Sequence, residues 1–261
     1  MGPVTGDLHT FSDPNHVPSL LQQPATCDVS VLTFSGGWPE DLRRLAAGLA
    51  SGSPAVDYEV LASANASPAV EAAIGDLAAA DPRVRGLSFS QHVGFGAGRN
   101  AGILQARGSV VVVADTSVEP TGDALTPLIE RLADPALGLA GAWGLVSADL
   151  RSFEEVPGSE GGGEVDALQA YWIAFRRAAV TPDLLFDPKF TFYRNADIDL
   201  SLRWRAAGFR VEAVDLPLVR HAHREWEALG PEERERKSRD NFARLLRRWR
   251  ERSDLLTGRA P

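Results

Sequence analysis

The sequence lacks several features that would place it quickly in a protein class. Cys27 is the only cysteine among 261 residues, which excludes a disulfide framework and a multi-cysteine zinc site. No apolar run approaches the ~20 residues that a membrane-spanning helix needs. The formal net charge of −8 and the pI near 5.2 are unlike those of a general nucleic-acid binder. The first residues have no basic segment and no apolar stretch typical of a signal peptide. These absences predict a soluble, cytoplasmic, globular protein.

What the sequence does contain is a regular alternation of β-rich and helical segments. Strands are predicted at residues 28–34, 57–64, 84–90, 109–115 and 138–146, and helices between them at 39–50, 67–80, 96–107 and 123–134. Short connections between such segments indicate βαβ units in a mostly parallel, doubly wound α/β sheet with helices on both faces. Pro39 in a first helical turn, and Ser67 as an N-cap before Pro68, support two of the helices.

The chain is expected to form one main domain. Residues 1–26 are rich in Pro, His, Ser and Gln and are predicted to be a flexible lead-in. Residues 27–228 are predicted to form a single α/β domain whose second half is less regular. That half contains a Gly-rich mobile loop at 157–165, strands at 165–177 and 209–219, and a helix at 195–208 that ends at Gly208. Residues 229–261 are predicted to be a basic amphipathic helix and tail.

Asp115 ends the apolar strand 109–115 and is followed by Thr116, Ser117 and Glu119. Ligands of parallel sheets bind at the carboxyl ends of the strands. Asp115 is therefore either a ligand for a metal and a phosphate or a cap for the next element.

A glycine cluster, GFGAGRNAG at 94–102, opens the helix before that strand. It does not have the G-x-G-x-x-G spacing of a dinucleotide fingerprint, because Arg99 stands where the third glycine belongs. A nicotinamide-dependent oxidoreductase is therefore disfavoured, and tight packing explains the glycines better. Arg99 itself, near a helix start at the ligand edge of the sheet, suits a phosphate or carboxylate.

Two later segments carry further candidates. Asp197 and Asp199 lie near the start of the helix at 195–208. Asp199 fits the role of a dipole partner or cap, whereas Asp197 is either another such partner or a general base that faces a cleft. His221 and His223 follow an extended run two residues apart, so both imidazoles would face one side, and a metal would use one of them beside Asp115. Surface or packing histidines are the commoner outcome for such a pair.

Four blocks in order resemble a family 2 glycosyltransferase with the GT-A fold over roughly residues 28–226. They are VSVLTFSGGWPEDLRRLAAGL, EVLASANASPA, HVGFGAGRNAGILQARGSVVVVADTSVEP and LLFDPKFTFYRNADIDLSLRWRAAGFRVEAVDLPLVRHAH. The third is similar to the family's block that ends in Asp-x-Asp, and the fourth to its acceptor block with a downstream histidine. The resemblance implies a Rossmann-like, mostly parallel sheet with an irregular acceptor-side half.

The resemblance also implies an activity and its residues. Such enzymes move a sugar from a nucleoside-diphosphate-sugar donor to an acceptor hydroxyl, usually with Mg²⁺ or Mn²⁺ and here with inversion. Asp197 would be the catalytic base. Thr33, Asn65, Arg99 and Asp115 would bind the nucleotide-sugar. Metal ligands would come from Asp115, Ser117, His221 and His223. The acceptor would be a glycan or a lipid-linked molecule, and nucleic acid is not an expected partner.

Three positions depart from the family pattern. Ala64 stands where an aspartate usually meets the nucleobase, Ser117 replaces the second carboxylate of Asp-x-Asp, and Ala196 replaces the glutamate before the base. Serine is a poorer ligand than carboxylate for a hard cation, and Glu119 would replace it only if the backbone bends. These departures leave open an alternative function, a catalytically silent GT-A-like scaffold or binding subunit.

The Arg-rich segment RLLRRWR at 244–250 allows two interpretations. Phe242, Leu245, Leu246 and Trp249 form one apolar stripe flanked by arginines. Such a stripe packs a terminal helix on its own domain or forms a homodimer. A basic amphipathic helix can also rest on anionic lipid, which would place the protein peripherally at the inner face of the membrane. Packing is the favoured interpretation.

Overall fold

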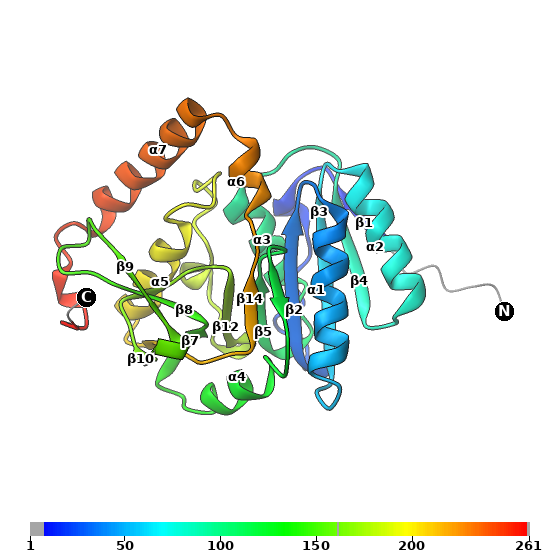
Figure 1. The fold of residues 1–261 in the computed structure, drawn as a ribbon, viewed down its shortest axis with the longest axis horizontal. Coiled ribbons are helices and arrows are strands. Elements are labelled where there is room, and N and C mark those ends of the chain that lie inside the picture. The colour runs from blue at the N-terminus through cyan, green and yellow to red at the C-terminus, as the bar shows by residue number, and fades with distance from the viewer. Residues whose placement is uncertain (1–7, 161, 260–261) are drawn as a thin grey trace.

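A computed structural model describes residues 8–160 and 162–259 and contains a nine-stranded sheet at its centre (Figure 1). The strand order is β1-β4-β3-β2-β5-β12-β7-β13-β10. The strands are β1 (Leu8–Phe11), β2 (Cys27–Ser35), β3 (Tyr58–Asn65), β4 (Val84–Phe89), β5 (Gly108–Ala114), β7 (Leu137–Gly141), β10 (Gly163–Glu164), β12 (Trp172–Arg176) and β13 (Arg210–Ala213).

The parallel central strands are nearly continuous in apolar residues because both faces of the sheet are buried. The Val-rich strand β5 pairs in parallel with β2, which pairs in parallel with β3, and β4 and β1 extend the same parallel set. On its other side β5 pairs antiparallel with β12, and β12 pairs antiparallel with β7. Continuous apolar strands of this kind are typical of sheets covered on both sides. The predicted mostly parallel α/β sheet is confirmed.

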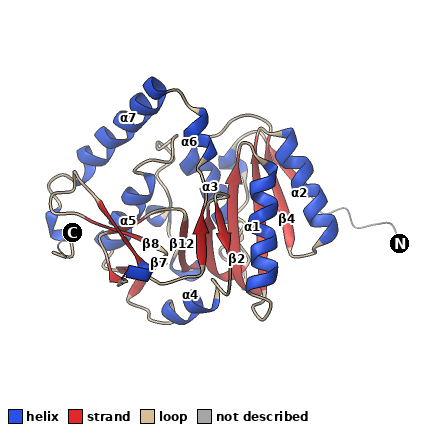
Figure 2. Cartoon of the chain, in the orientation of Figure 1, coloured by secondary structure: helices blue, strands red, loops and turns tan. Residues whose placement is uncertain are grey.

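Helices cover both faces of the sheet (Figure 2). The helices α1 (Pro39–Gly52), α2 (Pro68–Ala80) and α4 (Thr126–Arg131) pack on one face, and α3 (Phe95–Leu104) and α5 (Ala196–Ala206) on the other. The expected start of α2 is confirmed, because the Ser67 hydroxyl accepts a hydrogen bond from the Val70 N–H. The expected place of Pro39 in the first turn of α1 is confirmed as well.

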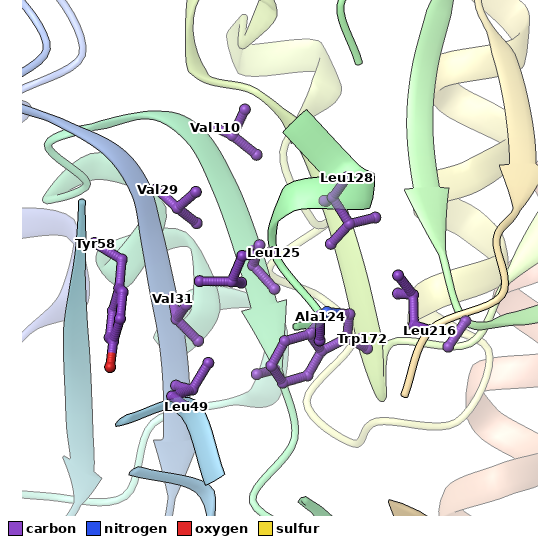
Figure 3. Packing of buried hydrophobic residues seen from close by; sticks show 14 of the residues in the cluster. Val29, Val31, Leu49, Tyr58, Val110, Ala124, Leu125, Leu128, Trp172 and Leu216 are labelled. Atoms are coloured by element: carbon purple, nitrogen blue, oxygen red, sulfur yellow. The ribbon is translucent and has the colours of Figure 1, made fainter. Parts of the chain in front are cut away.

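One of the two main core clusters lies between the sheet and helices α1 and α4, and Figure 3 shows part of its packing. Val31 of β2 lies next to Leu49 of α1, while Trp172 of β12, with no exposed surface, lies beside Ala124, which precedes α4. Each fully buried side chain of this size contributes roughly 1.5–3 kcal/mol relative to an exposed one. This buried core thus supports the strands whose carboxyl ends carry the candidate site residues.

The prediction of a flexible lead-in is wrong for part of residues 1–26. Leu8–Phe11 forms β1, which pairs in parallel with β4 at the edge of the sheet, and Val17 is buried against Phe89. The strand escaped detection because His9 and Thr10 leave no apolar alternation in so short a segment. Residues 1–7 lie outside the described part of the chain.

Three predicted long strands are each divided into two. Residues 138–146 form β7 and β8 (Trp143–Val146), residues 165–177 form β11 (Ala167–Leu168) and β12, and residues 209–219 form β13 and β14 (Leu218–Arg220). In each pair one strand belongs to the main sheet. The other joins a small sheet, either β11-β8-β9, with β9 at Glu154–Pro157, or β14-β6, with β6 at Val118–Pro120. The apolar runs give no sign of this division, since apolar residues continue through both halves of each predicted strand.

The prediction of a mobile loop at 157–165 is also wrong in part. Gly158–Glu160 forms a 3-10 turn, and β10 pairs with β13. A Cβ added to Gly158 would lie 2.0 Å from the carbonyl oxygen of Val214, so the backbones pack closely there. Glycine serves here for close approach and not for flexibility.

The last two helices are α6 (Arg224–Ala228) and α7 (Pro231–Trp249), which run above α5 in Figure 1. The α7 stripe packs on the chain itself, because Leu245 and Trp249 are buried with Ile198 and Leu202 of α5. The helix α5 ends as expected before Gly208, whose φ of +91° is a left-handed conformation that suits glycine. Over residues 8–160 and 162–259, no helix combines the length and apolar character that crossing a membrane requires.

Candidate active site

A cavity of about 1000 Å³ opens at the carboxyl end of β5, between the sheet edge, the start of α5 and the segment that contains α6 and α7. Several sequence-predicted residues line it, namely Arg99, Asp115, Asp197 and His223. The four segments that supply them, the end of β5, α3, α5 and the start of α6, are far apart in the chain. The carboxyl edge of a parallel sheet brings them together, as the sequence predicted for Asp115.

Asp115 is held rigidly by its own turn. Its Oδ1 accepts hydrogen bonds from the Ser117 hydroxyl at 2.7 Å and from the Ser117 N–H at 2.9 Å. Its Oδ2 lies 3.4 Å from a guanidinium nitrogen of Arg99 and 3.6 Å from Nε2 of His223. Burial opposes ionisation, but the imidazole and guanidinium neighbours outweigh it and hold the pKa of Asp115 well below its usual range. One oxygen of Asp115 therefore caps the turn and the other faces the cavity.

Arg99 is a buried cation, with 4% of its surface exposed. It lies over the Phe95 ring at 4.5 Å and donates a long hydrogen bond of 3.5 Å to the Ala114 carbonyl. Its Nε has no hydrogen-bond partner within the described structure. Burial lowers the pKa of Arg99 although Asp115 opposes the shift. A buried guanidinium with a spare donor at a cavity wall is suited to an anionic ligand.

His223 occupies the N-cap of α6, where its Nδ1 lies 3.2 Å from the Trp226 N–H. The same N–H donates to the His223 carbonyl oxygen at 2.9 Å, so it does not depend on the imidazole. Burial disfavours the imidazolium, but Asp115 outweighs burial and raises the pKa of His223.

Asp197 lies in the first turn of α5 and lines the cavity. Its two oxygens accept hydrogen bonds from the Ala170 N–H at 3.2 Å and the Ile198 N–H at 3.0 Å. Burial raises the pKa of Asp197 despite these donors. Asn195, which precedes the helix with a φ of +66°, turns the chain so that the first turn of α5 faces the cavity.

Asp199 has a different role from the expected cap. It is 1% exposed and accepts from Arg203 at 2.7 Å, from Arg248 at 2.7 Å and from the Trp249 indole N–H at 2.8 Å. A buried carboxylate needs such partners. Asp199 therefore fastens α7 to α5 and does not reach the cavity.

Two of the predicted metal ligands are not in the cavity. The Ser117 hydroxyl is bound to Asp115, and His221 pairs with Glu119 at 2.7 Å on the exposed side of β14. The expectation that both imidazoles face one side is wrong, because β14 ends at Arg220 and His223 begins a helix. Glu119 is engaged by His221 and is no substitute ligand. Across the described ranges, no group of three or more His, Cys, Asp or Glu side chains could hold a metal ion.

The predicted nucleotide-binding residues Thr33 and Asn65 lie at the carboxyl ends of β2 and β3, outside the lining of the cavity. Thr33 is 3% exposed and pairs with Ala114, next to Asp115, and its hydroxyl has no partner within the described residues. The Asn65 amide bonds both the N–H and the carbonyl of Val93. Ala64 is fully buried among apolar side chains and offers nothing to a base.

Sequence reasoning missed the aromatic wall around His223. The Tyr193 ring stacks on the imidazole with centroids 4.5 Å apart, and the Tyr171 ring meets it edge-on at 6.0 Å. Trp226 of α6 completes the wall. The aromatic-rich stretch FTFYRN was the available signal, but nothing in its spacing links it to residue 223.

Known proteins with similar sequences or folds indicate the family to which this chain belongs. The model for "Glycosyl transferase family 2" matches residues 31–189, more than half of the chain. The succinoglycan biosynthesis protein ExoO of Rhizobium meliloti (strain 1021) is 45% identical over 74 residues, which are 28% of this chain and 20% of that protein. The chain thus matches only about a fifth of that relative.

Solved structures share the fold. GalNAc-T7 with UDP, GalNAc and Mn²⁺ superposes with a TM-score of 0.67 and 14% identity, over 85% of this chain and 48% of that one. The mannosyltransferase PcManGT from Pyrobaculum calidifontis, in complex with GDP-Man and Mn²⁺, has a TM-score of 0.54 and 19% identity, over 80% of this chain and 58% of that one. These likenesses show the GT-A fold. With the family match over more than half its length, the chain belongs to glycosyl transferase family 2.

Proposed function

We propose that this chain transfers a sugar from a nucleoside-diphosphate-sugar to a hydroxyl of an acceptor, with inversion at the anomeric carbon. The observation that carries the proposal is the meeting of Asp115, Arg99 and Asp197 in one cavity at the carboxyl edge of the sheet. The family membership agrees with it.

Asp197 would act as the general base. The acceptor hydroxyl oxygen would attack the anomeric carbon as its proton passes to the Asp197 carboxylate, and the bond to the diphosphate would break with its electrons leaving on the diphosphate. Burial raises the pKa of Asp197. A base works best when its pKa approaches the operating pH, so this shift favours the role.

The donor would lie along the carboxyl ends of β2, β3 and β5. Arg99 and Asp115 would bind the diphosphate and ribose, and the nucleoside would extend toward Thr33 and Asn65 at the ends of the neighbouring strands. The two solved relatives contain UDP and GDP-Man, so UDP- and GDP-sugars are the first donors to test.

A divalent ion would be held by Asp115 and His223, and not by Ser117 or His221. The Asp115 Oδ2 and His223 Nε2 atoms lie 3.6 Å apart, a separation compatible with two ligands of one ion. Mg²⁺ is commonly held by one or two carboxylates together with substrate phosphates. Mg²⁺ or Mn²⁺ would neutralise the charge that develops on the leaving diphosphate. Both relatives were solved with Mn²⁺.

The test is Asp197→Asn assayed with UDP-glucose, UDP-GalNAc and GDP-mannose. Loss of the base should lower the transfer rate about 10²- to 10⁴-fold, while nucleotide affinity stays within about twofold because Asp197 would not contact the nucleotide. The matched control is Asp76→Asn, whose side chain is 71% exposed in a surface pair with Arg43. An unchanged transfer rate in Asp197→Asn would refute the proposal.

A silent scaffold is the second candidate, favoured by the engagement of Ser117 with Asp115 and by the apolar burial of Ala64 and Ala196. It predicts nucleotide binding without turnover. Metal-dependent transfer or hydrolysis of any donor would exclude it. The cytoplasmic or peripheral location, the homodimer through α7 and a glycan or lipid-linked acceptor stay predictions.

A further inference from the structure

The outer part of the cavity concentrates positive charge. Arg151 in the β8–β9 connection, Arg194 before α5 and Arg239 on α7 all line it, with Glu235 as the accompanying carboxylate. The whole chain has a formal charge of −8, so the cluster does not follow from composition. Three separate segments supply the arginines, which places them around one opening.

These three arginine side chains make few or weak interactions with other residues of the described structure. Arg194 lies over the Trp226 ring at 5.2 Å, and its guanidinium makes no hydrogen bond or ion pair within the described residues. Arg239 pairs with Glu235 at 3.0 Å, but the side chains are 70% and 75% exposed. Exposed pairs of this kind contribute only about 0.2–1 kcal/mol. No ion pair of Arg151 occurs within the described ranges.

In the inner part of the cavity, the positive charges are balanced by carboxylates. Arg99 and His223 face Asp115, and Asp197 lies beyond them, so the cations there already have carboxylate partners. Phe153 and Phe242 line the same cavity and add apolar surface. Ligand pockets usually measure about 300–1000 Å³, and this cavity of about 1000 Å³ is at the upper end of that range.

We infer that the acceptor carries an anionic group, a carboxylate or a phosphate, which Arg151, Arg194 and Arg239 bind while its hydroxyl faces Asp197. The inference rests on the proposed function and specifies its acceptor. Guanidinium groups bind carboxylates and phosphates through paired N–H donors, which explains why arginine from three segments gathers here.

The test compares neutral and anionic probes on the full chain in the presence of saturating UDP. Methyl glucoside is paired with methyl glucuronide, and glucose with glucose 6-phosphate, in titrations followed by calorimetry or ligand-observed NMR. The anionic member of at least one pair should bind at least tenfold more tightly, and added salt should weaken it, because exposed charges are screened. The pair with the larger difference tells carboxylate from phosphate.

Arginine substitutions test which side chains bind the anionic group of the probe. Arg151→Gln combined with Arg239→Gln should weaken the anionic probe about tenfold, whereas Arg239→Lys alone, which keeps the charge, should retain most of the affinity. Arg247→Gln is the control, because this exposed α7 arginine is not in the cavity lining. Equal binding of neutral and anionic probes would overturn the inference. So would a loss of UDP affinity equal to the loss for the probe, since the arginines would then serve the donor. If anionic probes bind and no donor is turned over, only the proposed function fails.

Discussion

At the scale of single residues, Asp115 is the first aspartate of an Asp-x-Asp motif in which serine replaces the second, and that serine holds its carboxylate. The residue two positions later, Ser117, cannot add a second charge, yet its hydroxyl and N–H both bind Asp115 Oδ1. The aspartate is thereby fixed with Oδ2 toward Arg99 and His223. Serine therefore orients the one remaining carboxylate of the motif and supplies no ligand of its own.

The first prediction concerns the titration of His223 in metal-free protein. Asp115 raises the pKa of His223 against burial, so Asp115→Asn should lower that pKa. Because the pKa of His223 is raised in the folded protein, this pair stabilises the fold at pH values below the unfolded-state pKa of about 6.5. That stabilisation is lost as the pH rises through the folded pKa. NMR of the imidazole protons in EDTA measures the shift. An identical titration in Asp115→Asn would contradict it, and Asp76→Asn should change nothing.

The second prediction concerns the pH dependence of transfer. Burial raises the pKa of Asp197, and only its ionised form can accept a proton. The rate should therefore fall as the pH drops through a value above the ordinary aspartate pKa of about 3.9. A profile of kcat/KM between pH 4 and 8 tests this. The acidic limb should be absent from the residual activity of Asp197→Asn. A limb at or below the ordinary value would argue against a buried base.

At the scale of elements, α7 is docked by a charged and an apolar contact together. Arg248 reaches Asp199 at 2.7 Å and Asp187 at 2.8 Å, and Trp249 packs beside Leu202. Both interpretations of the Arg-rich segment start from its apolar stripe. The described structure buries the centre of that stripe against α5, as the packing interpretation predicted.

The third prediction concerns the stability of this docking. Trp249→Ala should reduce the free energy of unfolding by about 3–5 kcal/mol, because it empties a buried site. Arg248→Ala should reduce it by about 1–3 kcal/mol through lost charged hydrogen bonds, with Arg203 still beside both aspartates. Urea denaturation provides the measurement. Arg247→Ala, at an exposed position of the same helix, should stay within about 0.5 kcal/mol. Equal effects at 247 and 248 would show that α7 is not held by these contacts.

At the scale of the whole molecule, the cavity is assembled from distant parts of the chain. The sheet edge supplies Asp115, α3 supplies Arg99, α5 supplies Asp197 and the start of α6 supplies His223. Nucleotide bound there would touch several elements at once. Binding to the folded state alone should therefore stabilise the whole domain.

The fourth prediction is a metal-dependent thermal shift. UDP or GDP at a hundred times its dissociation constant should add about 2.7 kcal/mol, which corresponds to roughly 5–10 °C for a domain of this size. EDTA should remove most of the shift if Asp115 and His223 hold an ion that the diphosphate shares. Differential scanning fluorimetry measures it. His223→Ala should resemble EDTA treatment, whereas His221→Ala, which lies outside the cavity, should leave the shift intact. Equal shifts with and without metal would exclude the ion.

The sequence by itself determined the parallel sheet, its helices and the place of Asp115, because apolar periodicity and the carboxyl-edge rule are local signals. The packing of the chain decided the rest. Only packing separated His223 from His221, turned Asp197 toward the cavity and Asp199 toward α7, and added β1 to the sheet edge. Which way a helix turns, and what lies opposite it, depends on contacts between residues that are tens of positions apart. No short stretch of the sequence contains both residues of such a contact.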